Sequence, residues 1–289
     1  MKQIVVIAAV MLAAALGAPA SAQTTDVPAA APLPEPPVPE PAVPSEYLTI
    51  ALGAAFVPDY EGSDDHRIVP GPVIRAKTGG ISIFSRGTYL YADFVDRPGG
   101  VDLDVGPIVG LRLNRTGKIK DDVVNELDDR NIAVEVGGFG GVTFKGLTNP
   151  YDSLSVRLDA VKDVANAHES WVFTPTVDFG TPLSLTTFVG ASLSADFVSD
   201  RYADYYFGVD ADEALRSGLA PYAPDGGSKS WQAGLLVSHS LSGDLRRGLA
   251  LFGTGSYKRL RGDFADSPLV ADRGSRRQWS AALGIGYTF

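Results

Sequence analysis

The chain has 289 residues and a formal charge of −9 at pH 7, from 25 Lys and Arg against 34 Asp and Glu. This acidic balance argues against nucleic-acid binding, which needs a basic surface, and against a basic helix lying on a membrane. The sequence contains no cysteine, so it offers no disulfide, no thiolate chemistry and no lipoprotein attachment site.

Residues 1–22 predict a cleaved signal peptide. Lys2 gives a basic start, residues 4–18 form an uncharged apolar run, and Ala20-Ser21-Ala22 has the small-residue pattern of a cleavage site. The run is shorter than the roughly 20 residues of a membrane-spanning helix, and no later segment supplies such a run. The exported chain is therefore expected to be either a soluble periplasmic protein or a barrel in the outer membrane.

Residues 23–45 are dense in Pro and Ala and contain neither Lys nor Arg. Such a segment cannot bury a core and is expected to be extended or disordered. We interpret it as a periplasmic linker, first as a plain spacer. A docking peptide for a periplasmic partner is the second interpretation.

From residue 46 to residue 289 the sequence alternates with period two in twelve segments, which predicts an all-β, antiparallel transmembrane barrel of about twelve strands. Ten strands are the main alternative, because the third and fourth segments are short and joined tightly around Arg86. The predicted strands are 46–57, 67–77, 80–85, 87–95, 101–113, 131–145, 153–163, 169–180, 184–198, 229–241, 246–259 and 276–289.

The last predicted strand carries the membrane signal. Trp279, Leu283 and Ile285 share one face, and Ser280, Gly284 and other small or polar residues share the opposite face. A soluble β-sandwich has the same period, so the signal peptide and the terminal aromatic Phe289 favour the barrel. We expect Phe289 to serve assembly into the outer membrane.

Connection lengths predict the sidedness of the barrel. Bacterial barrels have periplasmic termini, short periplasmic turns and longer extracellular loops. With residue 46 in the periplasm, the short connections 78–79, 96–100, 146–152, 181–183 and 242–245 fall there. The extracellular connections are then 58–66, 86, 114–130, 164–168, 199–228 and 260–275.

The polar face of these strands carries charges of both signs, which are expected to line the lumen. Opposite charges can pair across strands and support a narrow or loop-occluded interior, although a small-solute channel would use the same residue types. The candidate lumen charges are Arg75, Asp102, Asp104, Arg112, Glu135, Arg157, Asp159, Asp178, Asp196 and Lys258.

Three loop segments carry a family resemblance. They read VPDYEGSDDHR at 57–67, YADYYFGV at 202–209, and YKRLRGD with DSPLV at 257–263 and 266–270. Together they resemble the MltA-interacting protein (MipA/OmpV) family over essentially the whole chain after the Pro-rich segment. The motif residues are Pro58, Asp59, Tyr60, Gly62, Ser63, Tyr205, Tyr206, Gly208, Gly262, Asp263, Ser267 and Pro268.

The resemblance implies a non-enzymatic outer-membrane barrel, and some relatives are described as scaffolds that link a lytic murein transglycosylase to a murein synthase. Other relatives are known as surface antigens or adhesins. The expected partners are outer-membrane lipid, lipopolysaccharide and those two murein enzymes in the periplasm. A narrow porin-like channel for small solutes is the alternative function, and a surface antigen or adhesin is a further one.

The predicted sidedness places all three motifs at the extracellular rim, whereas murein enzymes work in the periplasm. Either the Pro-rich segment provides the tether, or this chain is not principally a scaffold. The motif residues also have a structural interpretation, since Pro58, Gly62 and Ser63 favour turns. Asp210 is expected to cap a short helix over 211–217 that ends at Gly218, and the loops are expected to fold over the barrel mouth.

The sequence predicts no catalytic residue, no metal site and no cofactor. His66, His168 and His239 are expected to be structural or solvated, and His168-Glu169-Ser170 cannot converge as a nucleophilic triad because neighbours on a strand face opposite ways. The acidic loop 114–130 could bridge lipopolysaccharide phosphates through divalent cations, but a solvated loop is the preferred interpretation.

Overall fold

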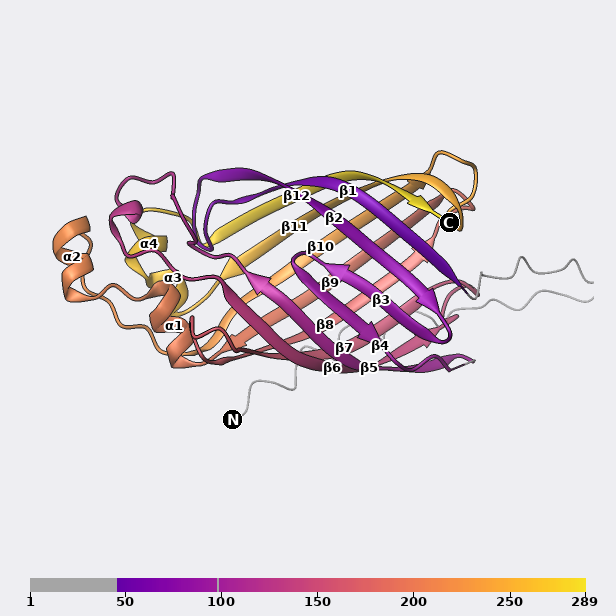
Figure 1. Ribbon diagram of the computed structural model, residues 1–289, viewed down its shortest axis with the longest axis horizontal. Helices are drawn as coiled ribbons and strands as arrows, with labels where there is room; N and C mark the ends of the chain where they lie inside the picture. Colours follow the sequence, from indigo (N-terminus) through magenta and orange to yellow (C-terminus); the bar gives the residue numbers. More distant parts are fainter. Residues whose placement is uncertain (1–45, 98) are drawn as a thin grey trace, which may run out of the picture. The chain divides into compact units, whose positions relative to one another are not determined.

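The computed structural model describes residues 46–97 and 99–289, and these form a closed barrel of twelve antiparallel strands (Figure 1). The twelve-stranded prediction is therefore confirmed, and the ten-stranded alternative is wrong. The predicted signal peptide 1–22 and linker 23–45 lie outside the described residues. The strands are β1 (Tyr47–Pro58), β2 (His66–Thr78), β3 (Ile81–Arg86), β4 (Tyr89–Asp93), β5 (Val101–Arg112), β6 (Ala133–Lys145), β7 (Ser153–Asp163), β8 (Trp171–Pro182), β9 (Thr187–Val198), β10 (Gly227–Ser240), β11 (Gly248–Leu260) and β12 (Arg277–Thr288).

Each strand pairs with its neighbours in sequence, and β12 returns to pair with β1. The closing ladder runs from Thr49 opposite Thr288 to Phe56 opposite Ala281. The terminal residue Phe289 continues it, because its N–H donates to the carbonyl of Leu48 at 2.9 Å. Closure satisfies the backbone of the first and last strands, which a sheet with free edges could not do in lipid.

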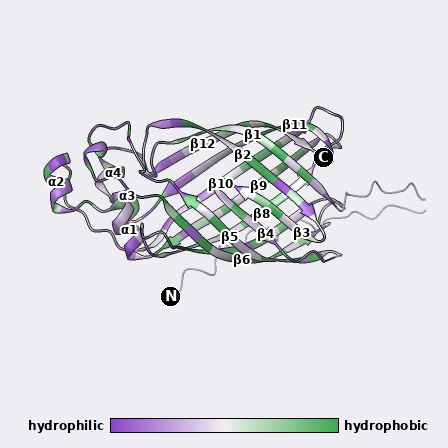
Figure 2. Cartoon of the chain, in the orientation of Figure 1, coloured by the Kyte–Doolittle hydropathy of each residue, from purple (hydrophilic) through white to green (hydrophobic). Residues whose placement is uncertain are grey.

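The two faces of the strands differ as the alternation predicts. Large apolar side chains stand exposed on the outside, including Leu52 (66 %), Leu235 (67 %) and Leu283 (73 %). Figure 2 shows apolar residues concentrated on the strands and hydrophilic residues at the end that carries the helices. The rings of Trp231, Tyr257 and Trp279 pack in a row near that end, as expected for the aromatic belt at a membrane interface.

The long loops gather at one end of the barrel, which is the extracellular end in bacterial outer-membrane barrels (Figure 1). The predicted helix over 211–217 is confirmed as α2 (Ala211–Ser217), with Asp210 and Glu213 forming the capping box and Gly218 in the left-handed conformation. No described helix is long and apolar enough to span a membrane. The other helices were not predicted and are η2 (Val124–Glu126), α1 (Asp200–Phe207), α3 (Asp263–Asp266) and α4 (Pro268–Ala271).

The close approach of β4 to β5 generates a test of the fold. A Cβ at Gly106 would lie 1.7 Å from the carbonyl oxygen of Ala92, whereas a Cβ at Gly140 would meet nothing within 4 Å. We expect Gly106→Ala to destabilise the barrel by about 1–3 kcal/mol, because backbone must move to accept the methyl group. Heat-modifiability on unboiled gels measures this, with Gly140→Ala as the matched control. Equal melting of the two variants would contradict the packing.

Candidate functional site

The end of the barrel that carries the long loops is covered by a packed cap, formed by the β1–β2 loop and residues 113–132, 199–226 and 261–276. Its buried apolar side chains come from all four segments, so the loops have a common core of their own. Phe207 on α1 packs edge-to-face against Phe264 on α3, with ring centroids 5.2 Å apart. The cap core includes Tyr60, Ile119, Val124, Leu127, Tyr202, Ala203, Tyr206, Phe207, Val209, Leu219, Leu260, Phe264, Leu269 and Val270.

The structure brings the three family-like motifs together inside this cap. The Tyr60 hydroxyl donates to the carbonyl of Leu269 at 2.9 Å, and the Ser267 hydroxyl donates to the carbonyl of Phe207 at 2.7 Å. These two bonds join the first motif to the third and the third to the second. The motif residues therefore hold loops far apart in sequence against each other.

The remaining motif residues lie in the same cap. Asp59, which is 3 % exposed, accepts a hydrogen bond from the backbone of Lys120, and Tyr205 accepts one from the backbone of Asn131. Gly262, at φ 53°, precedes α3. The others are Pro58 at the end of β1, Gly62 and Ser63 in the first turn, Tyr206 in the core, Gly208 after α1, Asp263 in α3 and Pro268 at the start of α4.

A buried cluster of charges lies where the cap meets the barrel. Lys229 on β10 is fully buried, and its Nζ lies 2.8 Å from Glu61 Oε1 and 3.3 Å from Asp196 Oδ2. Lys258 on β11 lies 3.1 Å from the same Glu61 oxygen. The Tyr202 hydroxyl accepts from Lys229 at 3.1 Å and donates to Glu61 at 3.2 Å. Two cations and two carboxylates thus neutralise each other around one phenol.

Tyr202 also links opposite walls of the barrel. Its ring lies 4.9 Å from the Nζ of Lys229 on β10 and 5.2 Å from the guanidinium carbon of Arg112 on β5. These strands are separated by five steps around a ring of twelve. The contacts therefore cross the mouth of the barrel, and cation–π attraction from both cations holds α1 there.

Glu61, Lys229 and Tyr202 were not singled out from the sequence. The alternation fails at Lys229 because β10 carries a register irregularity between Ser228 and Ser230, which leaves Lys229 and Ser230 both buried. The signal that could have found Lys229 is a charged residue at the first position of a predicted strand, together with the acidic residue Glu61 in the first motif segment. Sequence alone does not tell which strand faces that loop.

A second buried carboxylate, Glu135 on β6, organises the adjacent wall. It accepts from Arg112 Nε at 2.7 Å, from His168 Nε2 at 2.9 Å and from the Tyr89 hydroxyl. The Nδ1 of His168 lies 2.8 Å from the Ser170 hydroxyl. The carboxylate that contacts His168 is therefore that of Glu135 and not that of its sequence neighbour Glu169. His168 is 2 % and Ser170 5 % exposed, so the group is buried in the barrel wall.

The other predicted lumen charges lie further down the inner wall, and four of them, Asp102, Arg157, Asp159 and Asp178, form ion pairs. Arg157 Nε lies 2.6 Å from Asp159 Oδ1, and Arg86 lies 2.9 Å from Asp178. The guanidinium of Arg157 also stacks over Tyr91. The remaining positions are Asp102, which pairs with Lys145 at 2.8 Å, Asp104, which accepts from Thr143 at 2.5 Å, and Arg75, which is exposed beside Tyr47.

The electrostatics of Glu61 follow from its position. Burial on its own disfavours the charged carboxylate, but Lys229, Lys258 and Arg112 outweigh this effect and lower the pKa of Glu61 from 4.5 to about 2. The carboxylate is therefore charged at neutral pH and holds the first loop against the barrel wall.

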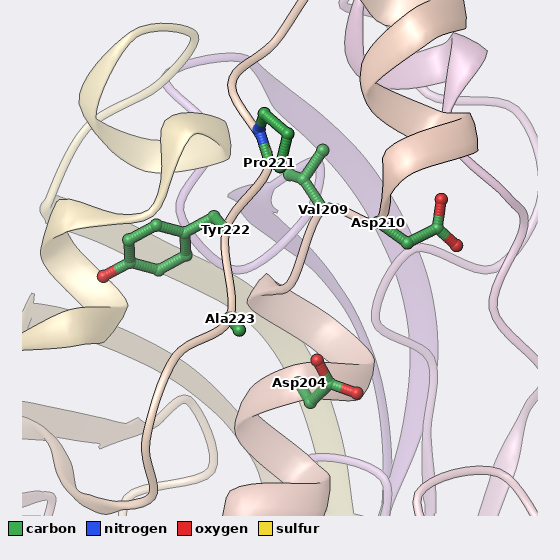
Figure 3. Close-up of a pocket in the computed structure, with 6 residues that line it drawn as sticks. All are labelled: Asp204, Val209, Asp210, Pro221, Tyr222 and Ala223. Atoms are coloured by element: carbon green, nitrogen blue, oxygen red, sulfur yellow. The ribbon is translucent and has the colours of Figure 1, made fainter.

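A shallow pocket lies on the outside of the cap (Figure 3), lined by Asp204, Val209, Asp210, Pro221, Tyr222 and Ala223. The Tyr222 ring points away from the two carboxylates, and its hydroxyl donates to the carbonyl of Asp263. Asp210 is engaged as the cap of α2. Two of the polar side chains that line the pocket, Tyr222 and Asp210, are therefore already engaged.

The acidic loop and the histidines hold no metal-like cluster among the described residues. Asp121 pairs with Arg273 at 2.7 Å and Asp128 with Arg216 at 2.5 Å. His66 stacks on Phe56, and His239 bonds Thr187 on the exterior.

The buried charge cluster predicts an asymmetric response to mutation. Lys229→Met would leave Glu61 and Asp196 buried with only Lys258 between them, and removing one partner of a buried ion pair costs about 3–5 kcal/mol. We expect a large fall in melting temperature. The control Arg201→Ala removes a pair whose side chains are 71 % and 52 % exposed, and we expect little change. Similar losses in both variants would contradict this account of the cluster.

The lowered pKa of Glu61 predicts that the cap loosens in acid. A depressed folded-state pKa contributes stability that is complete above about 4.5, the unfolded value, and is lost as pH falls toward about 2. Planar-bilayer conductance should therefore be low at pH 7 and rise as pH falls through this window. Glu61→Gln should conduct already at pH 7, and a conductance that rose with increasing pH would reverse the sign and refute the prediction.

Comparison with known proteins finds relatives in sequence and similar solved structures. Curated relatives named MltA-interacting protein, from Escherichia coli strain K12 and Shigella flexneri, are each 31 % identical over 103 residues, which are 35 % of this chain and 37 % of theirs. The match thus spans little more than a third of the length of these relatives.

Solved outer-membrane barrels are similar in outline. A channel from Pseudomonas putida F1 is 12 % identical, with 88 % of this chain and 100 % of that chain covered and a TM-score of 0.44. The NanC porin is 7 % identical, with 83 % and 98 % covered and a TM-score of 0.46. The family described as MltA-interacting protein MipA matches residues 50–289, and the chain belongs to that family.

Proposed function

We propose that this protein is a non-enzymatic outer-membrane scaffold that binds a lytic murein transglycosylase at its periplasmic face. The name of the curated relatives, MltA-interacting protein, motivates this proposal. Its structural support is the short-turn end of the barrel, where neighbouring turns make one continuous surface.

Hydrogen bonds between turns build that surface. Asn149 Nδ2 in the β6–β7 turn donates to Thr181 Oγ1 at the end of β8 at 2.9 Å. The backbone of Leu245 in the β10–β11 turn donates to the carbonyl of Leu185 in the β8–β9 turn at 3.0 Å. The three turns together expose Leu147 (54 %), Tyr151 (50 %), Leu183 (67 %), Leu185 (67 %) and Leu241 (55 %). Apolar side chains on connected turns are a surface suited to a protein partner.

A diffusion channel is the weaker candidate. The cap crosses the mouth through Arg112, Tyr202 and Lys229, and inner charges such as Arg157 and Asp159 pair with each other. Open pores instead keep their lining charges hydrated and available to the solute. An adhesin would use the outer surface of the cap, where Leu215 on α2 is 84 % exposed.

Pull-down with purified MltA tests the scaffold. We expect the full-length barrel in detergent to retain the enzyme, and Leu183→Ser with Leu185→Ser to weaken retention about tenfold or more, as loss of a few central contacts does at protein interfaces. Leu215→Ser is the matched control, since it removes an exposed leucine at the opposite end of the barrel.

A second arm removes residues 23–45. Loss of binding only in this arm would move the proposed contact from the turns to the Pro-rich segment. The absence of MltA from every pull-down, full-length protein included, would refute the scaffold proposal.

A further inference from the structure

The barrel wall is incomplete beside β2. This strand pairs with β1 along its whole length, from His66 to Lys77, but with β3 only over Arg75–Thr78. The β3–β4 hairpin between β2 and β5 is short, and in Figure 1 it ends well before the extracellular ends of its neighbours. Residues 66–73 of β2 therefore have a ladder partner on one side only. We call the space between these residues, the hairpin tip and the end of β5 the side opening.

The backbone of β2 shows which residues face the side opening. Ile74 N–H donates to Ser85 Oγ on β3, and the carbonyl of His66 accepts from Lys120 Nζ. The backbone N–H and C=O groups of every second residue point to the same side of a strand. The backbone of Pro70 and Pro72 therefore points toward the side opening, as the backbone of His66 and Ile74 does. Neither proline has an N–H to donate. The edge is therefore unable to add a further strand, which is the usual use of proline on edge strands.

Side chains on both faces of β2 are exposed beside the side opening. Exposure normally alternates along a barrel strand, but β2 is exposed on both faces: Ile68 (72 %) on the outside, and Val69 (38 %) and Val73 (37 %) on the inside. A Cβ at Gly71, on the inner face between the two valines, would meet nothing within 4 Å. On the far side of the side opening, the outward residue Leu111 of β5 is also apolar and exposed.

The side opening lies at the height of the outer leaflet. His66, at its upper end, stacks on Phe56 and lies 3.2 Å from the carbonyl of Trp279 in the aromatic belt. Two cations border it there. Arg67 reaches the carbonyl of Leu113 only at 3.5 Å and Asp59 at 3.9 Å, and its buried Nε has no hydrogen-bond partner. Lys120 is the second cation.

We propose that the side opening admits the acyl chain of an anionic phospholipid-type molecule from the outer leaflet. Its phosphate is held by Arg67 and Lys120, and its chain lies against Val69, Gly71 and Val73. The prolines exclude a pairing strand as the occupant, and the apolar borders exclude a small polar solute. The proposal is independent of the scaffold function, because it concerns the opposite half of the barrel.

Single-cysteine labelling tests the proposal, since the chain has no native cysteine. Full-length Gly71→Cys carrying a fluorophore is reconstituted in vesicles that contain phosphatidylglycerol with dibrominated acyl chains, which quench on contact. We expect quenching comparable with that of Leu52→Cys, on the outer face of β1. Ser192→Cys, on the inner face of β9 and five strands away, should be unquenched.

A second arm tests the headgroup contact. Replacing the quencher with dibrominated phosphatidylcholine should reduce quenching at position 71, and Arg67→Gln with Lys120→Gln should abolish the difference between the two lipids. Quenching at position 71 no greater than at position 192 would overturn the proposal. Equal quenching by both lipids in the otherwise native background would overturn the assignment of Arg67 and Lys120 to a phosphate.

Discussion

A strand that crosses a bilayer has no water to satisfy its backbone, so it depends on a hydrogen-bonded neighbour on each side. This constraint explains why β12 returns to β1 and why the terminal N–H of Phe289 is also bonded. It makes the exception at β2 informative. The upper part of β2 lacks a second neighbour, and Pro70 and Pro72 remove two of the amides that would point to that side.

The cap meets the same constraint in a different way. Loops that fold into the mouth of a barrel bring polar groups into a poorly solvated place, and burying a charge is costly unless it is paired. Glu61, Asp196, Lys229 and Lys258 satisfy this requirement together, with Tyr202 bonded between Glu61 and Lys229. The cluster holds the cap at a fixed depth, because a shift of the loop would separate these charges.

The sequence predicted the strands closely, because period-two alternation depends only on which face meets lipid. It also predicted α2, whose capping box and terminal Gly218 are local signals. It missed α1, although the helix holds Tyr202 at the centre of the mouth. Three of the four buried residues of α1 are aromatic and pack against other loops, so the signal for the helix is tertiary.

The side opening could not be predicted from the sequence either, because it also depends on tertiary structure. The short third and fourth strands were visible in the sequence, as was the Pro-Gly-Pro of β2. Neither the short strands nor the Pro-Gly-Pro segment predicts an opening by itself. The opening becomes evident only when the strand register places the short hairpin beside the half of β2 that contains the prolines. The lumen charges show the same limit, since alternation assigns a residue to a face but cannot tell that Glu135 meets His168, 33 positions away.

The inner wall itself is divided. The side formed by β12, β1 and β2 carries small or apolar residues such as Ala51, Gly284 and Val73 together with the cations Arg67 and Arg75, whereas the side formed by β4 to β8 carries Glu135, Arg157 and their partners. The apolar residues of the first side suit an acyl chain, and its cations suit an anionic head group. A molecule with an acyl chain and a charged head matches both, and the side opening borders the apolar half, where a chain arriving from the membrane would have to enter.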